Sequence, residues 1–153
     1  MLSQNCPWKP KEVIGGHGLI KEFSKEISDL SPRFVEIYND AYRAEQNGFS
    51  TIVGIGYRLA FEYLIKDYCI SLKPEEKDKI SKEQLSQCIN DYFDSDIKEL
   101  IKRTTWLGND FAHYETKHPD MNIQDLKKLI ELCVSEIVTK IQKKFYIESI
   151  VKK

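Results

Sequence analysis

Glycine and proline are both scarce in this chain, which has 7 glycines and 5 prolines among 153 residues. Such low usage disfavours collagen-like chains, linker-rich chains and turn-dense all-β folds, and it favours helices. Neither sign of charge is in excess, because the chain has 23 Lys and Arg residues and 24 Asp and Glu residues. The resulting formal net charge of −1 provides no global basic field that would attract nucleic acid or a membrane surface.

Long apolar runs are missing as well. The longest uncharged run extends from Gln46 to Tyr57, which is far shorter than the ~20 residues that a membrane span needs. The N-terminus has no basic start followed by an apolar segment. We therefore expect a cytoplasmic protein with no membrane partner. A hydrophobic content of 41% is enough for one domain with a single core.

The four cysteines are widely separated, and Cys69, Cys88 and Cys133 fall on the apolar faces of expected helices. We interpret these three as small hydrophobic residues. Cys6 resembles half of a zinc knuckle, but no second cysteine follows it at the required spacing and no later cysteine pair completes four ligands. The sequence therefore predicts no metal site and no cofactor.

Residues 1–18 contain two prolines and three glycines, which predicts an N-terminal arm before one helical domain at 19–153. Apolar residues at helical spacing predict main helices over 31–48, 50–74 and 122–145, with shorter helices over 19–30 and within 74–90. A further main helix is predicted to begin at Asp94 or Ser95 and to bend or end at Gly108 or near His113. Ser31 with Pro32, Ser50, and Asp94 or Ser95 are the expected helix starts, and Asn122 with Asp125 resembles a capping box. The predicted fold is an all-α bundle of four main helices plus short extra helices.

The helix over 50–74 is expected to be largely buried. Ile52, Ile55, Leu59, Tyr63 and Tyr68 mark its expected inner face, which Phe61, Leu64 and Ile65 widen. Gly54 and Gly56 lie within this helix, where each glycine costs about 1 kcal/mol relative to alanine. Such a cost is tolerated where another backbone comes close, so we expect a tight helix crossing there.

Polar side chains gather in the segment 106–115. Asn109 and His113 are four residues apart and face the same way on a helix, so the amide can orient the imidazole. Asp110 and Tyr114 have the same spacing and are expected to share a helix face. Arg58 and Glu62 have the same spacing on an otherwise apolar helix, which predicts a partly buried ion pair. A purely structural role stays open for both pairs. His113 could bridge helices through a hydrogen bond, and the Arg58–Glu62 pair could join the helix over 50–74 to the helix that begins at Asp94 or Ser95. The candidate binding residues are Arg58, Glu62, Asn109, Asp110, His113 and Tyr114.

Three motifs in order, over 31–38, over 54–62, and at Gly108 and Asn109 with His113, carry a family resemblance that extends from Ser31 to Thr139. On these residues the chain resembles the bacterial family called domain of unknown function 4145, which is similar to the HEPN superfamily of helical bundles. The resemblance implies a homodimer. Many HEPN proteins are metal-independent ribonucleases that use an Arg, then a polar residue, then a His.

Gly108 occupies the Arg position of that motif, while Asn109 and His113 match its other two positions. We therefore expect a non-catalytic, self-associating module of a bacterial cytosolic system linked to nucleic acid or defence, with RNA or another phosphate-containing ligand as its expected partner. The alternative is a metal-independent HEPN-type ribonuclease with His113 as general acid/base, Asn109 orienting it and Arg58 supplying the missing cation.

Overall fold

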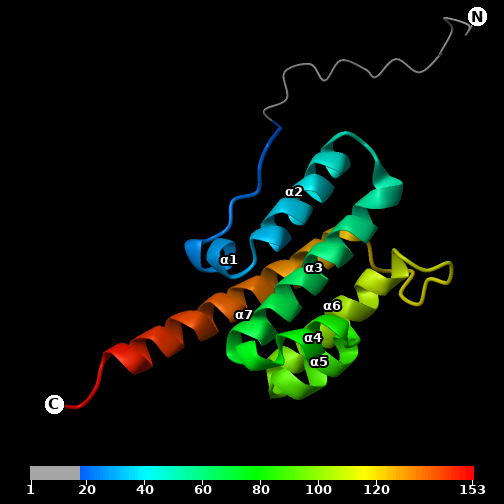
Figure 1. The fold of residues 1–153 in the computed structure, drawn as a ribbon. Helices are drawn as coiled ribbons and strands as arrows, with labels where there is room; N and C mark the ends of the chain where they lie inside the picture. Colours follow the sequence, from blue (N-terminus) through cyan, green and yellow to red (C-terminus); the bar gives the residue numbers. More distant parts are fainter. Residues whose placement is uncertain (1–17) are drawn as a thin grey trace, which may run out of the picture.

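Helix α3 (Ser50–Leu72) is the centre of the computed structural model, which describes residues 18–153, and it contacts every other helical element (Figure 1). The other long helices are α2 (Pro32–Gln46), α6 (Ser95–Asp110) and α7 (Ile123–Ser149). The short elements are α1 (Lys25–Leu30), the 3-10 turn η1 (Pro74–Glu76), α4 (Lys77–Lys82) and α5 (Leu85–Tyr92). The predicted all-α bundle is confirmed over this part of the chain. Most of the predicted arm, including Cys6, lies outside the described residues.

Local capping signals place the starts of two long helices. The Ser31 side chain accepts a hydrogen bond from the Phe34 backbone N–H at 3.3 Å, and Pro32 takes the first helical position of α2. Asn122 and Asp125 form the predicted capping box of α7. The expectation for Ser50 is wrong by one residue, because Ser50 is already inside α3 and Phe49 precedes it without a side-chain cap.

The segment before α1 is not helical, which corrects the helix predicted over 19–30. Leu19 and Ile20 are 71% and 64% exposed, and α1 begins only at Lys25. Asn39 on α2 explains the difference, because its side chain bonds both the N–H of Lys21, at 2.8 Å, and the C=O of Lys21, at 3.1 Å. These hydrogen bonds satisfy the backbone N–H and C=O of Lys21, so these two groups do not need helical partners.

The face that α3 buries also differs from the predicted one. Ile52, Ile55, Leu59 and Tyr63 are exposed, whereas Tyr68 and the three residues predicted to widen the face, Phe61, Leu64 and Ile65, are buried. The inner face is therefore centred on the widening residues and not on the row from Ile52 to Tyr63. Its buried members are Val53, Gly54, Tyr57, Ala60, Phe61, Leu64, Ile65, Tyr68 and Cys69. Because α3 is apolar almost all round, its spacing fits more than one inner face.

Both predicted close approaches at glycine are present in α3. A Cβ atom placed on Gly56 would lie 2.8 Å from the Ala41 Cβ, so α2 and α3 are in backbone-close contact there. At Gly54 the neighbour is not a helix but the ring of Phe111, which follows α6, and a Cβ would lie 2.4 Å from its Cβ and Cγ. Gly54 therefore forms a notch that holds the chain where it leaves α6.

The last turns of α7 extend past the other helices (Figure 1). Phe145, the last residue of the helix predicted over 122–145, is 62% exposed and borders a hollow beside α1. The expectation that three cysteines are core residues is confirmed, since Cys69, Cys88 and Cys133 are all fully buried. None of the helices within residues 18–153 combines the length and the apolar character needed to span a bilayer.

Candidate functional site

Arg58 joins α3 to α6 through Asn109. Its Nε donates a hydrogen bond of 2.8 Å to the Oδ1 of Asn109. Gly108 permits this contact, because a Cβ atom there would lie 3.3 Å from the Arg58 Cγ, within the space that the arginine stem fills. Arg58 thus lies directly against Gly108 of α6.

The charge of Arg58 is partly balanced on its own helix. Its guanidinium lies 3.9 Å from the Glu62 carboxylate, and Lys66 lies 3.3 Å from the same carboxylate. The side chains of Arg58 and Glu62 are only 33% and 29% exposed. The predicted pair is therefore present, as part of a row of alternating charges along α3.

Beyond α6 the chain turns away at once. Phe111 ends the helix with its ring in the Gly54 notch, and the backbone N–H groups of Ala112 and His113 both donate to the Asn109 carbonyl at 3.0 Å. The expectation that Asp110 and Tyr114 share a helix face is wrong, because the helix has already ended and the Tyr114 side chain is fully exposed.

Asp110 instead holds His118, a residue for which the sequence predicts only a place in a loop. One carboxylate oxygen of Asp110 accepts from the His118 backbone N–H at 2.8 Å and lies 2.7 Å from the ring Nδ1. The Asp110 side chain is only 6% exposed. Burial by itself would raise the pKa of Asp110, but the hydrogen bonds from the His118 ring and the neighbouring backbone outweigh it and lower the pKa below its usual value.

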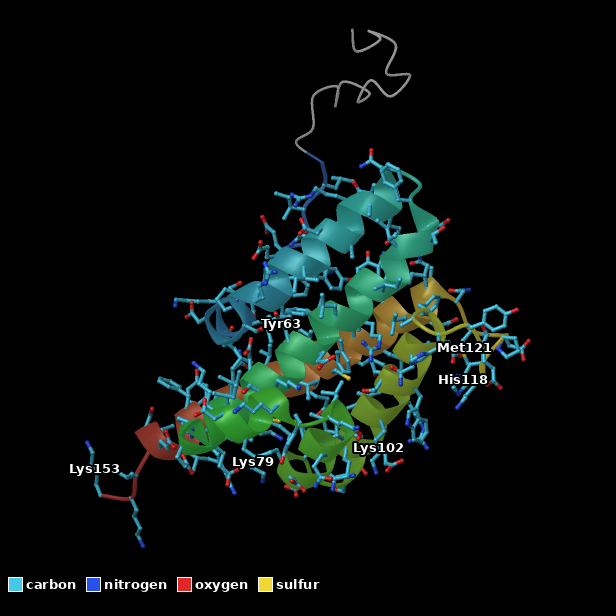
Figure 2. The ribbon with its side chains drawn as sticks, turned by 45° about the vertical axis from the view of Figure 1, so that its right-hand side comes forward. Tyr63, Lys79, Lys102, His118, Met121 and Lys153 are labelled. Atoms are coloured by element: carbon cyan, nitrogen blue, oxygen red, sulfur yellow. The ribbon has the colours of Figure 1, made fainter. Side chains whose placement is uncertain are left out.

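These residues surround a cleft of about 600 Å³ beside the loop that follows α6. Figure 2 shows His118 in this loop, at the end of the molecule opposite Lys153. We call it the α6-terminal cleft, and its lining residues are Trp106, Asn109, Asp110, His113, Glu115, Lys117 and His118. Such a size is ordinary for a small-ligand site.

The structure brings together only some of the predicted site residues. Arg58, Glu62 and Asn109 form one cluster, whereas Asn109, Asp110 and His113 line the cleft. Within residues 18–153 no side-chain hydrogen bond joins the His113 ring to Asn109, whose Oδ1 is occupied by Arg58. Asn109 is therefore the link between the two groups.

A second hollow, of about 630 Å³, lies between α2 and α7. Two of its lining residues, Gln124 and Lys127, donate to Glu45 at 2.8 Å and 3.0 Å, and Glu45 also accepts from Tyr57 at 2.6 Å. Burial first, and then the Glu45 hydrogen bond, raise the pKa of the Tyr57 hydroxyl. This network ties α2, α3 and α7 together beside the hollow.

No family model, curated protein or solved structure matches the chain. Among the described residues, no group of three or more His, Cys, Asp or Glu side chains is placed to hold a metal ion. Cys6, whose surroundings suggested half of a zinc knuckle, is not among the described residues.

Proposed function

We propose that the chain is a non-catalytic helical module that self-associates through the exposed face of α3. The observation that carries this proposal is a row of four large apolar side chains. We call it the α3 stripe: Ile52, Ile55, Leu59 and Tyr63, which are 56%, 47%, 43% and 38% exposed.

The spacing of the α3 stripe makes it one continuous surface. Residues three and four apart are neighbours on a helix, so the row runs along more than half of α3. Single exposed apolar residues are common, but a contiguous apolar patch on a soluble domain marks an interaction surface. Phe49, which is 62% exposed, lies just before the row and lengthens it.

Charge supports a second copy as the partner. Arg58, Glu62 and Lys66 alternate in sign on α3 and keep partly exposed side chains. A two-fold axis makes a surface face itself, so two antiparallel copies of α3 set Arg58 of one protomer near Glu62 of the other. A stable pair is expected to bury about 1,200 Å² or more in total.

The non-catalytic part of the proposal rests on Arg58. A ribonuclease of the HEPN type needs a cation and an imidazole aimed at one phosphodiester. Arg58 donates to Asn109 and is close to Glu62, and it is not among the residues that line the cleft with His113. Loss of one preorganised donor commonly costs about 10²–10³ in rate.

The wider setting that we propose is the bacterial cytoplasm, in a system that handles nucleic acid or acts in defence. It is supported by the family resemblance of the motifs in α2, α3 and α6. The module would contribute a dimeric scaffold there.

Two matched glutamate variants test the proposed surface. Leu59 on α3 and Leu132 on α7 have almost the same exposure, 43% and 42%. Gel filtration should show that Leu59→Glu elutes as a monomer while Leu132→Glu elutes with the unmodified dimer, and far-ultraviolet circular dichroism should show both folded. A Leu132→Glu monomer beside a Leu59→Glu dimer would move the interface to α7 and refute the α3 stripe.

The ribonuclease alternative is tested directly on RNA in the presence of a chelator. We expect no cleavage above background by the unmodified protein. Metal-independent cleavage that is lost in both His113→Ala and Arg58→Ala, with each variant folded, would overturn the non-catalytic assignment.

A further inference from the structure

The end of α7 exposes a second group of large apolar side chains, separate from the α3 stripe. We call it the α7 tip, and its members are between 60% and 74% exposed: Phe145, Tyr146, Ile147, Ile150 and Val151. Each of them is more exposed than any member of the α3 stripe. The tip lies where α7 extends past the other helices (Figure 1). Clustered apolar exposure of this kind marks an interaction surface.

The apolar side chains of the α7 tip point to several sides of the helix. Successive residues of an α-helix are about 100° apart around its axis, so Phe145, Tyr146 and Ile147 together cover about 200° of the circumference. A groove on a partner protein covers only one face of a helix. The interface of a lipid bilayer, in contrast, surrounds a tip that enters it. The distribution of these side chains therefore favours a lipid surface over a protein groove.

Lysines flank the α7 tip on both sides. Residues 140–153 contain five lysines and a single glutamate, Glu148. Two exposed lysines directly precede the tip and two directly follow it, and these are Lys143, Lys144, Lys152 and Lys153. Figure 2 shows Lys153 beyond the end of the bundle. The expectation of no membrane partner rested in part on the formal net charge of −1, which averages over this local positive excess.

The single sign of this charge disfavours a second copy of the chain as the occupant. Two α7 tips in contact would bring like charges together, which is costly, whereas the charges beside the α3 stripe alternate in sign. The surface that covers the tip is therefore negatively charged. It must also take aliphatic side chains out of water, as Ile147 and Ile150 require. A bilayer with anionic lipids provides both, because its headgroups are negative and its interior is apolar.

We propose that the α7 tip inserts into the surface of a bilayer that contains anionic lipids, with its flanking lysines at the headgroups. The long lysine stems let the ammonium groups stay at the headgroup level while the apolar side chains lie deeper. The Tyr146 ring suits the boundary, since it combines an apolar body with a polar hydroxyl. Insertion of this kind is about 5–10 Å deep, so it does not need the membrane-spanning helix that residues 18–153 lack.

Glu148 gives the proposal a test of sign. It is an exposed residue between Ile147 and Ile150, so its carboxylate is carried to the anionic surface together with the tip. The carboxylate opposes insertion twice, because it loses water and because the headgroups repel it. Glu148→Gln should therefore tighten binding, whereas removal of lysines should weaken it.

Sedimentation of the full chain with vesicles measures these effects. We expect binding to vesicles of equal parts phosphatidylserine and phosphatidylcholine, and binding weaker by at least about tenfold to phosphatidylcholine alone. Each lysine near an anionic surface contributes about fivefold, so Lys143→Gln combined with Lys144→Gln should weaken binding by about twentyfold. Ile147→Ser should weaken it by about tenfold through the loss of apolar surface.

Two matched controls test whether the effects belong to the tip. Leu19→Ser changes a side chain of nearly the same exposure as Ile147, 71% against 74%, in the segment before α1. Lys117→Gln combined with Lys128→Gln removes the same charge from exposed positions in the loop after α6 and near the start of α7. Both controls should bind the mixed vesicles like the unmodified chain, and circular dichroism should show every variant folded.

Three results would overturn the proposal. Equal weakening by the two lysine pairs would mean that the vesicles attract positive charge anywhere on the chain. Equal binding to the two kinds of vesicle would show that anionic headgroups are not recognised. Failure of the unmodified chain to sediment with the mixed vesicles would reject a lipid surface and would make an acidic protein the occupant of the tip.

Discussion

Replacing Gly54 with alanine tests the contact that positions the whole segment after α6. The added Cβ would lie 2.4 Å from both Cβ and Cγ of Phe111. Carbon atoms in ordinary contact are about 3.5–4.0 Å apart, so the ring has to move by more than about 1 Å. Because Phe111 directly precedes the loop that carries His113 and His118, the displacement should extend to the cleft.

Two opposing effects determine how much Gly54→Ala changes the free energy of unfolding. Alanine improves on glycine by about 1 kcal/mol inside a helix. Overpacking costs about 1–3 kcal/mol, so Gly54→Ala should lower the free energy of unfolding by about 0–2 kcal/mol in the unmodified chain. In a Phe111→Gly background both the Cβ and the ring are gone, and the same change at Gly54 should raise the free energy of unfolding by about 1 kcal/mol. The coupling between the two positions is then about 1–3 kcal/mol.

Urea unfolding of the four proteins of this cycle, followed by circular dichroism, measures the coupling. Gly56→Leu is a useful companion, since it should cost about 1–3 kcal/mol by overpacking against Ala41 and should be indifferent to Phe111. If Gly54→Ala has the same effect with and without the Phe111 ring, to within about 0.3–0.5 kcal/mol, the notch does not hold the ring and the reasoning is refuted.

Three further predictions concern caps, acid and thiols. Ser31→Ala removes the side-chain cap of α2 and the hydroxyl that donates to the half-buried Asp67. Urea unfolding should show the free energy of unfolding lowered by about 1–2 kcal/mol. An unchanged free energy would show that the cap contributes nothing. The pKa of Asp110 is lowered in the folded state, so its bond to His118 stabilises fully above the ordinary carboxyl pKa of 3.8 and is lost as the pH falls through the folded value. The stability difference between the unmodified chain and Asp110→Asn should therefore shrink in acid, and a constant difference from pH 6 to pH 2 would contradict this. Burial raises the pKa of the Cys133 thiol to about 12, so this thiol should react with a disulfide reagent at pH 8 only after urea is added.

Sequence patterns predicted the structure correctly where contacts between residues close in sequence determine it. The start of α2 at Ser31 and Pro32 and the capping box at Asn122 depend on contacts within four residues, and both predictions are confirmed. The start of α1 was wrong because Asn39, eighteen residues away, binds the backbone of Lys21. A propensity pattern contains no information on such a contact.

The exposed face of α3 and most of the cleft depend on tertiary placement. Because α3 is apolar almost all round, the spacing of Ile52, Ile55 and Leu59 was equally suited to a core or to an interface. The Arg58–Glu62 pair is local and was predictable, whereas Arg58–Asn109 joins residues that are 51 positions apart. His118 could be assigned only once the end of α6 at Asp110 was known, since that end turns the chain back toward the carboxylate.

The mass of the unmodified chain in solution tests the central claim most directly. Light scattering at tens of micromolar, coupled to gel filtration, measures this mass without reference to shape. Self-association through the α3 stripe predicts twice the chain mass of 17.9 kDa. A mass of 17.9 kDa at that concentration would contradict it and would leave the α3 stripe as a surface for a different partner.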